Sequence, residues 1–482
     1  MSQSESPHRQ GNAKDILNKL GLHSKHAADL LTADDLRHAP TLAEEYRTYV
    51  SFAKTERKSA SYFLEKAVEH GFADLSDARA VDEKTLVIPY RNKVTACVRL
   101  GSGSIDEGMN VIASHQDSPR LDLKGRPLYQ DQELALLKTH YYGGVRKYQW
   151  VTRPLAMHGV VVLENGESVE ITIGEDESDP VLTILDLLPH LAAKQNAKKL
   201  GDAITAEKLN IVVGGYPYGK DEGANRIKAT VLGILEHRFG MVEEDFISAE
   251  LEIVPAGPAR YVGLDGAFIG AYGHDARACA FTGMRALFDA EPGERTQVML
   301  CVDKEEIGSF GNTSAQGRIL HHIVDRILVA LGETPGEHRI NTILHRSKCI
   351  SADVAAAIDP DWAEVHDRRN GALTGHGIVF KKFTGARGKS GASDASAELV
   401  GEVRRLYKDA GVPFQSAEMG KVDEGGGGTI AKFLAATGME VIDSGPAVLA
   451  MHSPFELIHV LDLYSAYKAY KAFLERATRA DD

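Results

Sequence analysis

A continuous apolar run that stops at a charged cluster constrains the fold of this chain most. The run, Val298–Val302, predicts a strand buried on both faces of a parallel sheet, because its apolar and polar residues do not alternate. It stops at residues 303–306, which read Asp-Lys-Glu-Glu. In open α/β sheets, functional groups collect beyond the carboxyl ends of such strands. The sequence therefore favours an α/β fold with chemistry near Glu305 and Glu306, although this pair alone also fits a solvated acidic turn.

Other apolar or small-residue runs also end in histidine or carboxylate side chains. These ends carry His115 with Asp117, then Asp275, Asp353 and His452. Because parallel strands bring their carboxyl ends to one edge of a sheet, all of these side chains can converge on one place. Two of them also have purely structural explanations: His115 fits a hydrogen-bonded core histidine, and Asp353 fits a helix cap.

Together, imidazole and carboxylate ligands suit zinc, cobalt or manganese. The set is larger than one ion requires, and two ions about 3.5–4 Å apart would share a bridging carboxylate. Since neighbouring side chains diverge, Glu305 and Glu306 would serve different purposes, one binding a metal and the other handling protons. The strand ends therefore predict two divalent metal ions, with Zn²⁺ first and Co²⁺ or Mn²⁺ as alternatives.

Composition and charge exclude several kinds of partner. With 482 residues the chain exceeds one typical domain, and 43% hydrophobic residues provide an ample core. A net charge of −13 argues against nucleic acid as a partner. No apolar run reaches membrane-spanning length and the N-terminus lacks an apolar signal segment, so we expect a cytoplasmic protein without a membrane partner. The four cysteines are scattered, without the close pairs of a redox motif or zinc ribbon.

The sequence pattern changes after Lys124 and again near residue 259. In the outer parts strands alternate with helical patterns, which predicts a mostly parallel central sheet flanked by helices. The middle part has short alternating runs, and Asn165-Gly166 is a strong hairpin signal because both turn positions favour positive φ. We therefore expect a catalytic domain from residues 1–127 and 259–482, and a smaller β-rich domain inserted at residues 128–258.

Periodicity and capping residues predict individual elements. Residues 42–71 are helical in pattern, with Thr55 as an N-cap and Gly71 as the stop. Further helices are expected at residues 224–239, capped by Gly240, and at residues 461–476. The predicted strands cover residues 85–88, 95–100, 109–113, 159–163, 168–173, 246–254, 298–302, 348–350 and 440–442.

Five segments carry a resemblance to a known family. They read SHQDSPRLDLK, VDKEEIGS, SADVAAAIDP, DEGGGGTIAKFLA and AMHSPFE. In order and spacing they resemble the signatures of metallopeptidase family eighteen, which includes aspartyl aminopeptidase and vacuolar leucine aminopeptidase. The likeness runs from about Tyr90 to the C-terminus and is nearest to the bacterial branch. It implies a zinc-peptidase type of α/β fold and release of the N-terminal residue from peptides with a free N-terminus.

The resemblance also implies roles for the residues at the strand ends. One metal would be bound by His115, Asp275 and Asp353, and the other by Asp275, Glu306 and His452, so that Asp275 bridges them. Glu305 would be the general base. Asp117 would hold the free ring nitrogen of His115, a contact that metal-bound histidines usually need. In this clan the peptide bond after the bridging aspartate is commonly cis.

Assembly and substrate binding follow from the same resemblance. The family forms tetrahedral homododecamers built from dimers, and the position of His190 implies that it stabilises an oxyanion in a neighbouring subunit. From sequence alone, His190 is a histidine on a helix surface. Lys381, Arg387 and the glycine turn around Gly427 are expected to line the substrate pocket.

The chain departs from the aspartyl enzymes near the pocket. Ala276 and Ala356 replace an asparagine and a histidine, and Lys381–Lys389 lacks the tyrosine of the corresponding segment. These changes leave the metal ligands intact and argue against a preference for acidic residues. The leading prediction is a two-metal aminopeptidase. The alternatives are another two-metal hydrolase, such as a carboxypeptidase or amide deacylase, and a non-catalytic assembly protein with a relic site.

Overall fold

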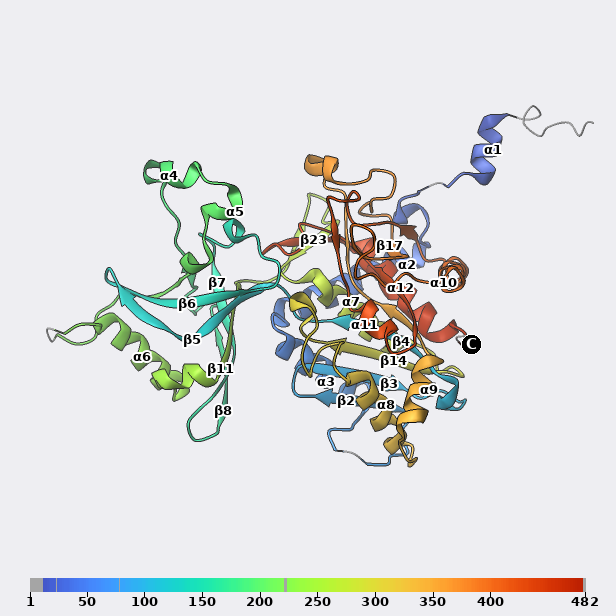
Figure 1. Cartoon of the computed structure of the whole chain (residues 1–482), viewed down its shortest axis with the longest axis horizontal. Coiled ribbons are helices and arrows are strands. Elements are labelled where there is room, and N and C mark those ends of the chain that lie inside the picture. The colour runs from blue at the N-terminus through green and yellow to red at the C-terminus, as the bar shows by residue number, and fades with distance from the viewer. Residues whose placement is uncertain (1–11, 23, 78, 221–222, 480–482) are drawn as a thin grey trace, which may run out of the picture.

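The computed structural model describes residues 12–22, 24–77, 79–220 and 223–479. A nine-stranded sheet forms its centre, in the order β1-β2-β3-β14-β4-β15-β21-β17-β19 (Figure 1). The strands are β1 (Ala73–Asp74), β2 (Thr85–Tyr90), β3 (Val94–Arg99), β4 (Met109–His115), β14 (Thr296–Val302), β15 (Lys348–Ser351), β17 (Ile378–Lys381), β19 (Phe414–Ser416) and β21 (Glu440–Gly445). The predicted strand 298–302 is confirmed as the buried interior of β14.

The four middle strands of this sheet are parallel and in register. Val302 at the end of β14 pairs with His115 at the end of β4, and Ser351 at the end of β15 pairs with Ala113. β21 continues the parallel set beside β15. Among the described strands of this sheet, antiparallel pairs occur only outside the four middle strands or at their borders, at β2–β3, β3–β14 and β21–β17. The carboxyl ends of β14, β4 and β15 therefore lie side by side.

Helices cover both faces of this sheet, because its strand residues alternate between two cores. Ile112 and Met299 pack against α2 (Ala33–Phe52), α3 (Glu56–Glu69), α7 (His274–Asp289), α10 (Ala397–Asp409) and α12 (Val460–Arg476). Their neighbours Val111 and Val298 point to the other face, against α8 (Ile319–Ala330), α9 (Glu337–His345) and α11 (Ala431–Ala435). The sheet is thus buried between two helical layers.

A second sheet, of seven antiparallel strands, lies beside the nine-stranded sheet and its helices, on the left of Figure 1. Its strand order is β8-β7-β11-β5-β6-β10-β9. It has its own apolar core. Its strands are β5 (Arg120–Asp131), β6 (Leu134–Tyr142), β7 (Leu155–Val162), β8 (Ser168–Ile173), β9 (Thr183–Ile184), β10 (Ile211–Gly214) and β11 (Ala249–Pro255). The helices of this region are α4 (Ala193–Asn196), α5 (Leu200–Ala203) and α6 (Arg226–Phe239), which ends at the left-handed Gly240 as predicted. The predicted hairpin across Asn165-Gly166 is confirmed by the β7–β8 pairing.

Buried ion pairs join the seven-stranded sheet to the region of the nine-stranded sheet. Arg120 at the start of β5 lies 3.1 Å from a carboxylate oxygen of Glu252 on β11 and 3.4 Å from one of Glu56 on α3. All three side chains are buried, so removal of one would leave charge without compensation. Lys54 reinforces the junction, because its ammonium donates to the carbonyls of Pro255 and Gly257.

Two smaller sheets complete the fold. One has five strands in the order β12-β13-β23-β22-β16, and the other pairs β18 with β20. Their bounds are β12 (Arg260–Val262), β13 (Phe268–Ala271), β16 (Ala355–Ala356), β18 (Gly385–Ala386), β20 (Gly426–Gly427), β22 (Ala447–Leu449) and β23 (Glu456–His459).

Two predicted elements were wrong in part. The helical pattern over residues 42–71 is two helices, α2 and α3, because the chain breaks at residues 53–55. Thr55 is the N-cap of α3, as predicted, and accepts the backbone N–H of Lys58. The predicted strand 246–254 starts only at Ala249, because the residues before it form a 3-10 helix, Glu243–Ser248.

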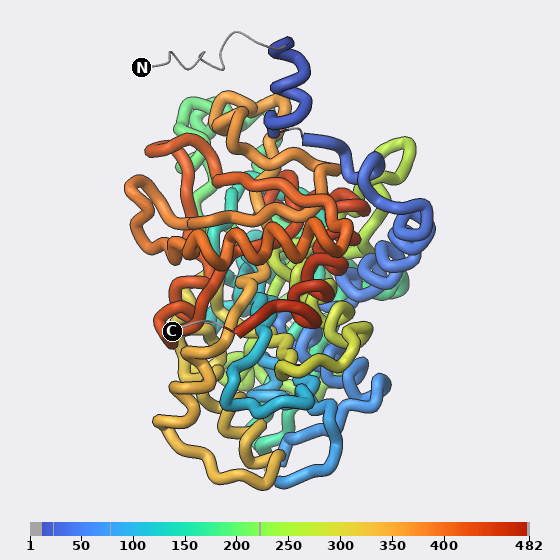
Figure 2. The backbone as a smooth tube through the Cα atoms, turned by 90° about the vertical axis from the view of Figure 1, so that its right-hand side faces the viewer, coloured from blue at the N-terminus to red at the C-terminus, as the bar shows by residue number. Residues whose placement is uncertain are grey.

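The first described helix, α1 (Ala13–Leu20), projects away from the rest of the molecule (Figures 1 and 2). None of its residues is buried. Among the described residues, no helix combines the length and the apolar character that crossing a membrane requires.

Candidate metal centre

The predicted site residues come from five separate places in the fold. His115 ends β4, Asp275 opens α7, Asp353 follows β15, Glu306 follows β14, and His452 lies between β22 and β23. The parallel register of β14, β4 and β15 places three of these positions next to one another. The structure therefore brings the predicted metal ligands together at one edge of the nine-stranded sheet.

The carboxylate of Asp275 lies between the two imidazoles. Its Oδ1 is 3.2 Å from Nε2 of His115, and its Oδ2 is 3.1 Å from Nε2 of His452. Each imidazole faces one further carboxylate: Asp353 lies 3.7 Å from His115, and Glu306 lies 3.4 Å from His452. Two sets of donor atoms thus share Asp275.

Backbone contacts fix Asp275 on both sides. Its N–H donates to Glu456, and its carbonyl accepts the hydroxyl of Ser118 at 2.7 Å. The following peptide bond, Asp275-Ala276, is cis, as the resemblance implied. Glu456 also accepts the backbone N–H of His452, so one buried carboxylate holds both segments. Glu456 is not among the residues predicted from the sequence, where its only signal is its place in the AMHSPFE segment.

Asp117 has a larger role than the sequence suggested. The ring nitrogen Nδ1 of His115 lies 3.0 Å from the backbone carbonyl of Asp117 and 3.4 Å from its carboxylate. The carboxylate accepts the backbone N–H groups of Glu305 at 3.1 Å and of Glu306 at 3.2 Å. It also accepts the hydroxyl of Tyr142. Asp117 therefore orients the turn that carries both glutamates, besides contacting His115.

The electrostatics of the centre fit a bound cation. Burial, together with nearby carboxylates such as Asp353, raises the pKa of Glu305 to about 8. Burial opposes the charged form of His452, but its hydrogen bond to Asp275 outweighs this and raises its pKa to about 10. One buried oxygen of Glu306 has no hydrogen-bond partner. The raised pKa of Glu305 and the unpartnered oxygen of Glu306 both indicate buried carboxylates that lack a compensating cation, a condition that a bound metal ion would relieve.

The donor set suits zinc in particular. His115, Asp275 and Glu306 offer ligand atoms that all lie within 4.8 Å of one another. One imidazole nitrogen and carboxylate oxygens are ligands that zinc takes in proteins. The second ring nitrogen of each histidine contacts a backbone carbonyl, as in known zinc sites.

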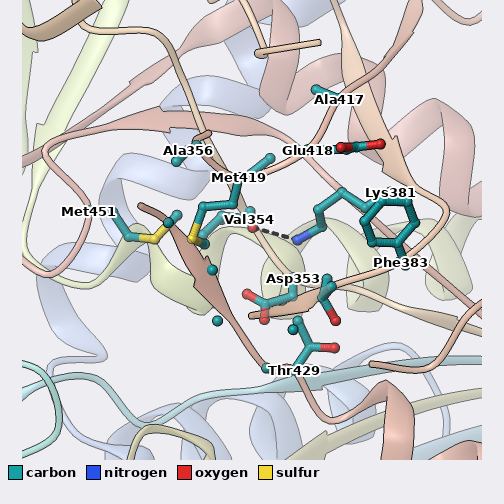
Figure 3. Close-up of a pocket in the computed structure, with 18 of the residues that line it drawn as sticks. Asp353, Val354, Ala356, Lys381, Phe383, Ala417, Glu418, Met419, Thr429 and Met451 are labelled. Carbon is teal, nitrogen blue, oxygen red and sulfur yellow. Dashed lines mark hydrogen bonds between the residues drawn. The ribbon is translucent and has the colours of Figure 1, made fainter. Parts of the chain in front are cut away.

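A cavity of about 370 Å³ opens onto this centre. Asp275, Glu305, Glu306 and Asp353 line it. Apolar side chains such as Val354, Met419 and Met451 form part of the wall around Asp353 (Figure 3). The cavity is also lined by Lys381, Arg387, and the glycines 425–428. Lys381 is buried, and its ammonium donates to the carbonyl of Val354 at 2.9 Å. The expected substrate residues therefore lie at the cavity, but Lys381 is already engaged by the protein.

His190 lies elsewhere in the chain. It belongs to a short 3-10 helix, Pro189–Leu191, in the region of the seven-stranded sheet, and it is exposed. It does not line the cavity. Within one chain, the structure does not bring His190 to the centre.

The sequence matches a known family over most of its length. The matching family model is described as Aminopeptidase I zinc metalloprotease (M18) and covers residues 49–474. A probable M18 family aminopeptidase 1 from Borreliella afzelii is 45% identical over 447 residues, which cover 92% of this chain and 97% of that protein. Another from Thermotoga maritima is 44% identical over 435 residues, covering 90% and 95%.

Solved structures share the fold. An M18 family aminopeptidase from Thermotoga maritima superimposes with a TM-score of 0.90 at 42% identity, covering 94% of this chain and 99% of that chain. Aminopeptidase I from Clostridium acetobutylicum gives 0.87 at 38% identity, covering 94% and 100%. The mApe1 dodecamer of S. cerevisiae gives 0.73 at 21% identity, covering 91% and 97%, and so shares the fold.

We expect zinc to raise the melting temperature of chelator-treated protein, and Asp275→Asn to abolish this rise, because both imidazoles face Asp275. The rise should be larger at about pH 8 than at about pH 6, since both histidines have raised pKa values in the metal-free protein and must lose a proton to bind zinc. Scanning calorimetry measures both effects. The exposed Asp361→Asn is the control and should respond like wild type. An undiminished rise in Asp275→Asn would place the zinc elsewhere.

Proposed function

The chain belongs to the M18 family of zinc aminopeptidases, and from this premise we propose that it removes single N-terminal residues from peptides with two metal ions and a glutamate base. One observation carries the two-metal proposal: the two oxygens of Asp275 face different imidazoles, 3.2 and 3.1 Å away. His115 and Asp353 would complete one donor set, and Glu306 and His452 the other. Zn²⁺ fits the donors best, with Co²⁺ or Mn²⁺ as alternatives.

Glu305 is the proposed general base. It lines the cavity, and among the described residues its carboxylate makes no hydrogen bond to a predicted metal ligand. Its pKa is raised to about 8 in the metal-free protein. Bound ions would supply Lewis acidity and a water of lowered pKa. The carboxylate of Glu305 would accept the proton of that water and later deliver it to the leaving amine. Asp117 would hold Glu305 in place through its backbone N–H.

Recognition of a free N-terminus follows from the proposed metal ions. Asp275, Glu305, Glu306 and Asp353 all line the cavity. With the metal ions bound, a neutral α-amine of the substrate can bind one of them, whereas recognition of a substrate α-carboxylate would need a free basic group. The nearest buried cation, Lys381, is hydrogen-bonded to Val354. An exopeptidase acting at the amino end therefore fits the cavity better than one acting at the carboxyl end.

We further propose that residues 128–258 form an assembly domain and that residues 1–127 and 259–482 form the catalytic domain. The region around His190 exposes a set of large apolar side chains that a partner subunit would cover: Val181, Leu185, Leu187, Leu188 and Leu191. The solved mApe1 assembly, which shares the fold, is a dodecamer. A tetrahedral dodecamer built from dimers would let His190 reach the centre of a neighbouring subunit.

The adjacent glutamates should respond differently to the same substitution. Glu305→Gln should keep the bound zinc and lose nearly all turnover, because an amide cannot accept the proton of water. Glu306→Gln should instead weaken zinc binding, because an amide is a poorer ligand than a carboxylate. Elemental analysis and steady-state kinetics on aminoacyl anilides test both variants. Equal loss of zinc in the two would mean that their roles are wrongly assigned.

Peptides with neutral or apolar N-terminal residues should be cleaved at least as well as those with Asp or Glu. The cavity wall includes Val354, Met419 and Met451, and Lys381 is engaged by the protein (Figure 3). The measurement is kcat/KM for a peptide series that differs only in the first residue, with N-acetylated peptides as uncleaved controls. A tenfold preference for acidic residues, about 1.4 kcal/mol, would contradict this prediction.

His190 should act across a subunit boundary. His190→Ala and Glu305→Gln should each be nearly inactive, since loss of one oxyanion donor typically costs about 10²–10³ in kcat. Reassembly of equal amounts of the two variants should restore about a quarter of wild-type activity, because random pairing joins an intact Glu305 to an intact partner His190 at that fraction of sites. Subunit exchange is verified by mass spectrometry. An exchanged mixture that stays inactive would show that His190 does not act in trans.

A further inference from the structure

The segment that follows β6 reaches from the seven-stranded sheet into the metal centre. Two of its residues, Tyr142 and Gly144, contact Asp117 and His452, and Gly143 between them leaves little room for a side chain beside Glu306. We propose that this Tyr142–Gly144 segment is a positioning element, which sets the orientation of His452 and of the turn that carries Glu305 and Glu306. The inference rests on the proposed function of the metal centre, and it adds to that centre residues that do not bind the metal themselves.

Tyr142 acts through Asp117. Its hydroxyl donates to Oδ2 of Asp117 at 2.8 Å, and the same carboxylate accepts the backbone N–H groups of Glu305 and Glu306. Tyr142 and Asp117 are both buried, so water does not replace this hydroxyl if it is lost. Burial and the neighbouring carboxylate of Asp117 raise the pKa of Tyr142, which keeps it a proton donor in this bond.

Tyr142 is in turn held by the junction of the two sheets. The guanidinium of Arg120 lies 3.9 Å from the centre of the Tyr142 ring. That guanidinium is fixed by Glu252 of the seven-stranded sheet and by Glu56 of α3. The phenol therefore cannot move without disturbing a buried ion-pair network, which makes it a rigid support for Asp117.

Gly144 acts on His452 directly. Its carbonyl oxygen lies 3.3 Å from Nδ1 of His452, so this nitrogen can donate while Nε2 faces Asp275 and Glu306. A Cβ at Gly144 would lie only 2.9 Å from Nδ1 and would push the imidazole from its position. The backbone of Gly144 does not have the positive φ that strains other residues, so close approach to His452 is the reason for glycine here.

Gly143 lies where the backbone passes close to Glu306. It has a φ of +73°, and a Cβ there would lie 3.2 Å from the Cβ of Glu306. The three residues thus reach three separate parts of the centre: Asp117, Glu306 and His452. Outer contacts of this kind typically change metal affinity or activity by about 10–100-fold when removed.

Gly144→Ala and Tyr142→Phe test the inference, each beside a matched control. Gly125→Ala, also on the seven-stranded sheet, adds a methyl group to open space. Tyr141→Phe removes the hydroxyl of the neighbouring, partly exposed tyrosine. Zinc affinity is measured by competition with a chelator, the coordination geometry by the visible spectrum of cobalt-loaded protein, and kcat and KM separately.

Gly144→Ala should weaken zinc binding at least tenfold relative to Gly125→Ala, and should change the cobalt spectrum. Tyr142→Phe should lower kcat at least tenfold relative to Tyr141→Phe, with KM within twofold. A crystal structure of metal-free Gly144→Ala should show the imidazole of His452 displaced from Asp275. The proposal stands only if the imidazole is displaced and at least one solution effect appears.

Two results would overturn the proposal: an unmoved imidazole in that crystal structure, or variants that match their controls in zinc affinity, cobalt spectrum and kcat. Failure of the proposed function looks different, because wild-type protein would then bind no zinc or cleave no peptide. In that case the solution measurements no longer count, and the position of the His452 imidazole in the metal-free Gly144→Ala variant alone decides the positioning role. A displaced imidazole supports the role and an unmoved one overturns it, since that structure requires neither zinc nor turnover.

Discussion

The centre gathers more buried negative charge than its two imidazoles can compensate, and much of the surrounding structure serves this constraint. Asp275, Glu305, Glu306 and Asp353 line one cavity, where the imidazoles of His115 and His452 face Asp275. The buried ammonium of Lys381 is already hydrogen-bonded to Val354. Burial of like charges raises the pKa of carboxylates and would favour their protonation. A divalent cation removes the conflict, and the family to which the chain belongs is one of zinc enzymes.

Main-chain groups hold this charged cluster in place before any ion arrives. Asp117 and Glu456 are both buried, yet neither is among the predicted ligands. Asp117 accepts the N–H groups of Glu305 and Glu306, and Glu456 accepts those of Asp275 and His452. Two carboxylates thus fix four peptide groups from three distant segments. Such preorganisation means that binding does not need to order the ligands, which lowers its entropic cost.

Much of the fold and of the site could be predicted because apolar runs and strand ends are local features. The interior of β14 and the cap at Thr55 follow from residues adjacent in sequence. The convergence of His115, Glu306 and Asp353 follows from the parallel strands that they end. The roles of Tyr142 and Glu456 could not be predicted, because they arise from contacts across different sheets. The break between α2 and α3 was not predicted, although the cap at Thr55 was. At the break, Lys54 donates to the distant carbonyls of Pro255 and Gly257, contacts that a local pattern does not reveal.

The order of the segments along the chain has a consequence for biosynthesis. The seven-stranded sheet uses only residues between Arg120 and Pro255, so all of its strands have left the ribosome before β14 is made. The nine-stranded sheet must wait for β21, and the donor set must wait for His452, close to the C-terminus. Domains fold as units during synthesis, and distant pairings form late. The Tyr142–Gly144 segment is therefore made before the last predicted ligand, His452, and a complete set of predicted zinc ligands exists only when translation is almost complete.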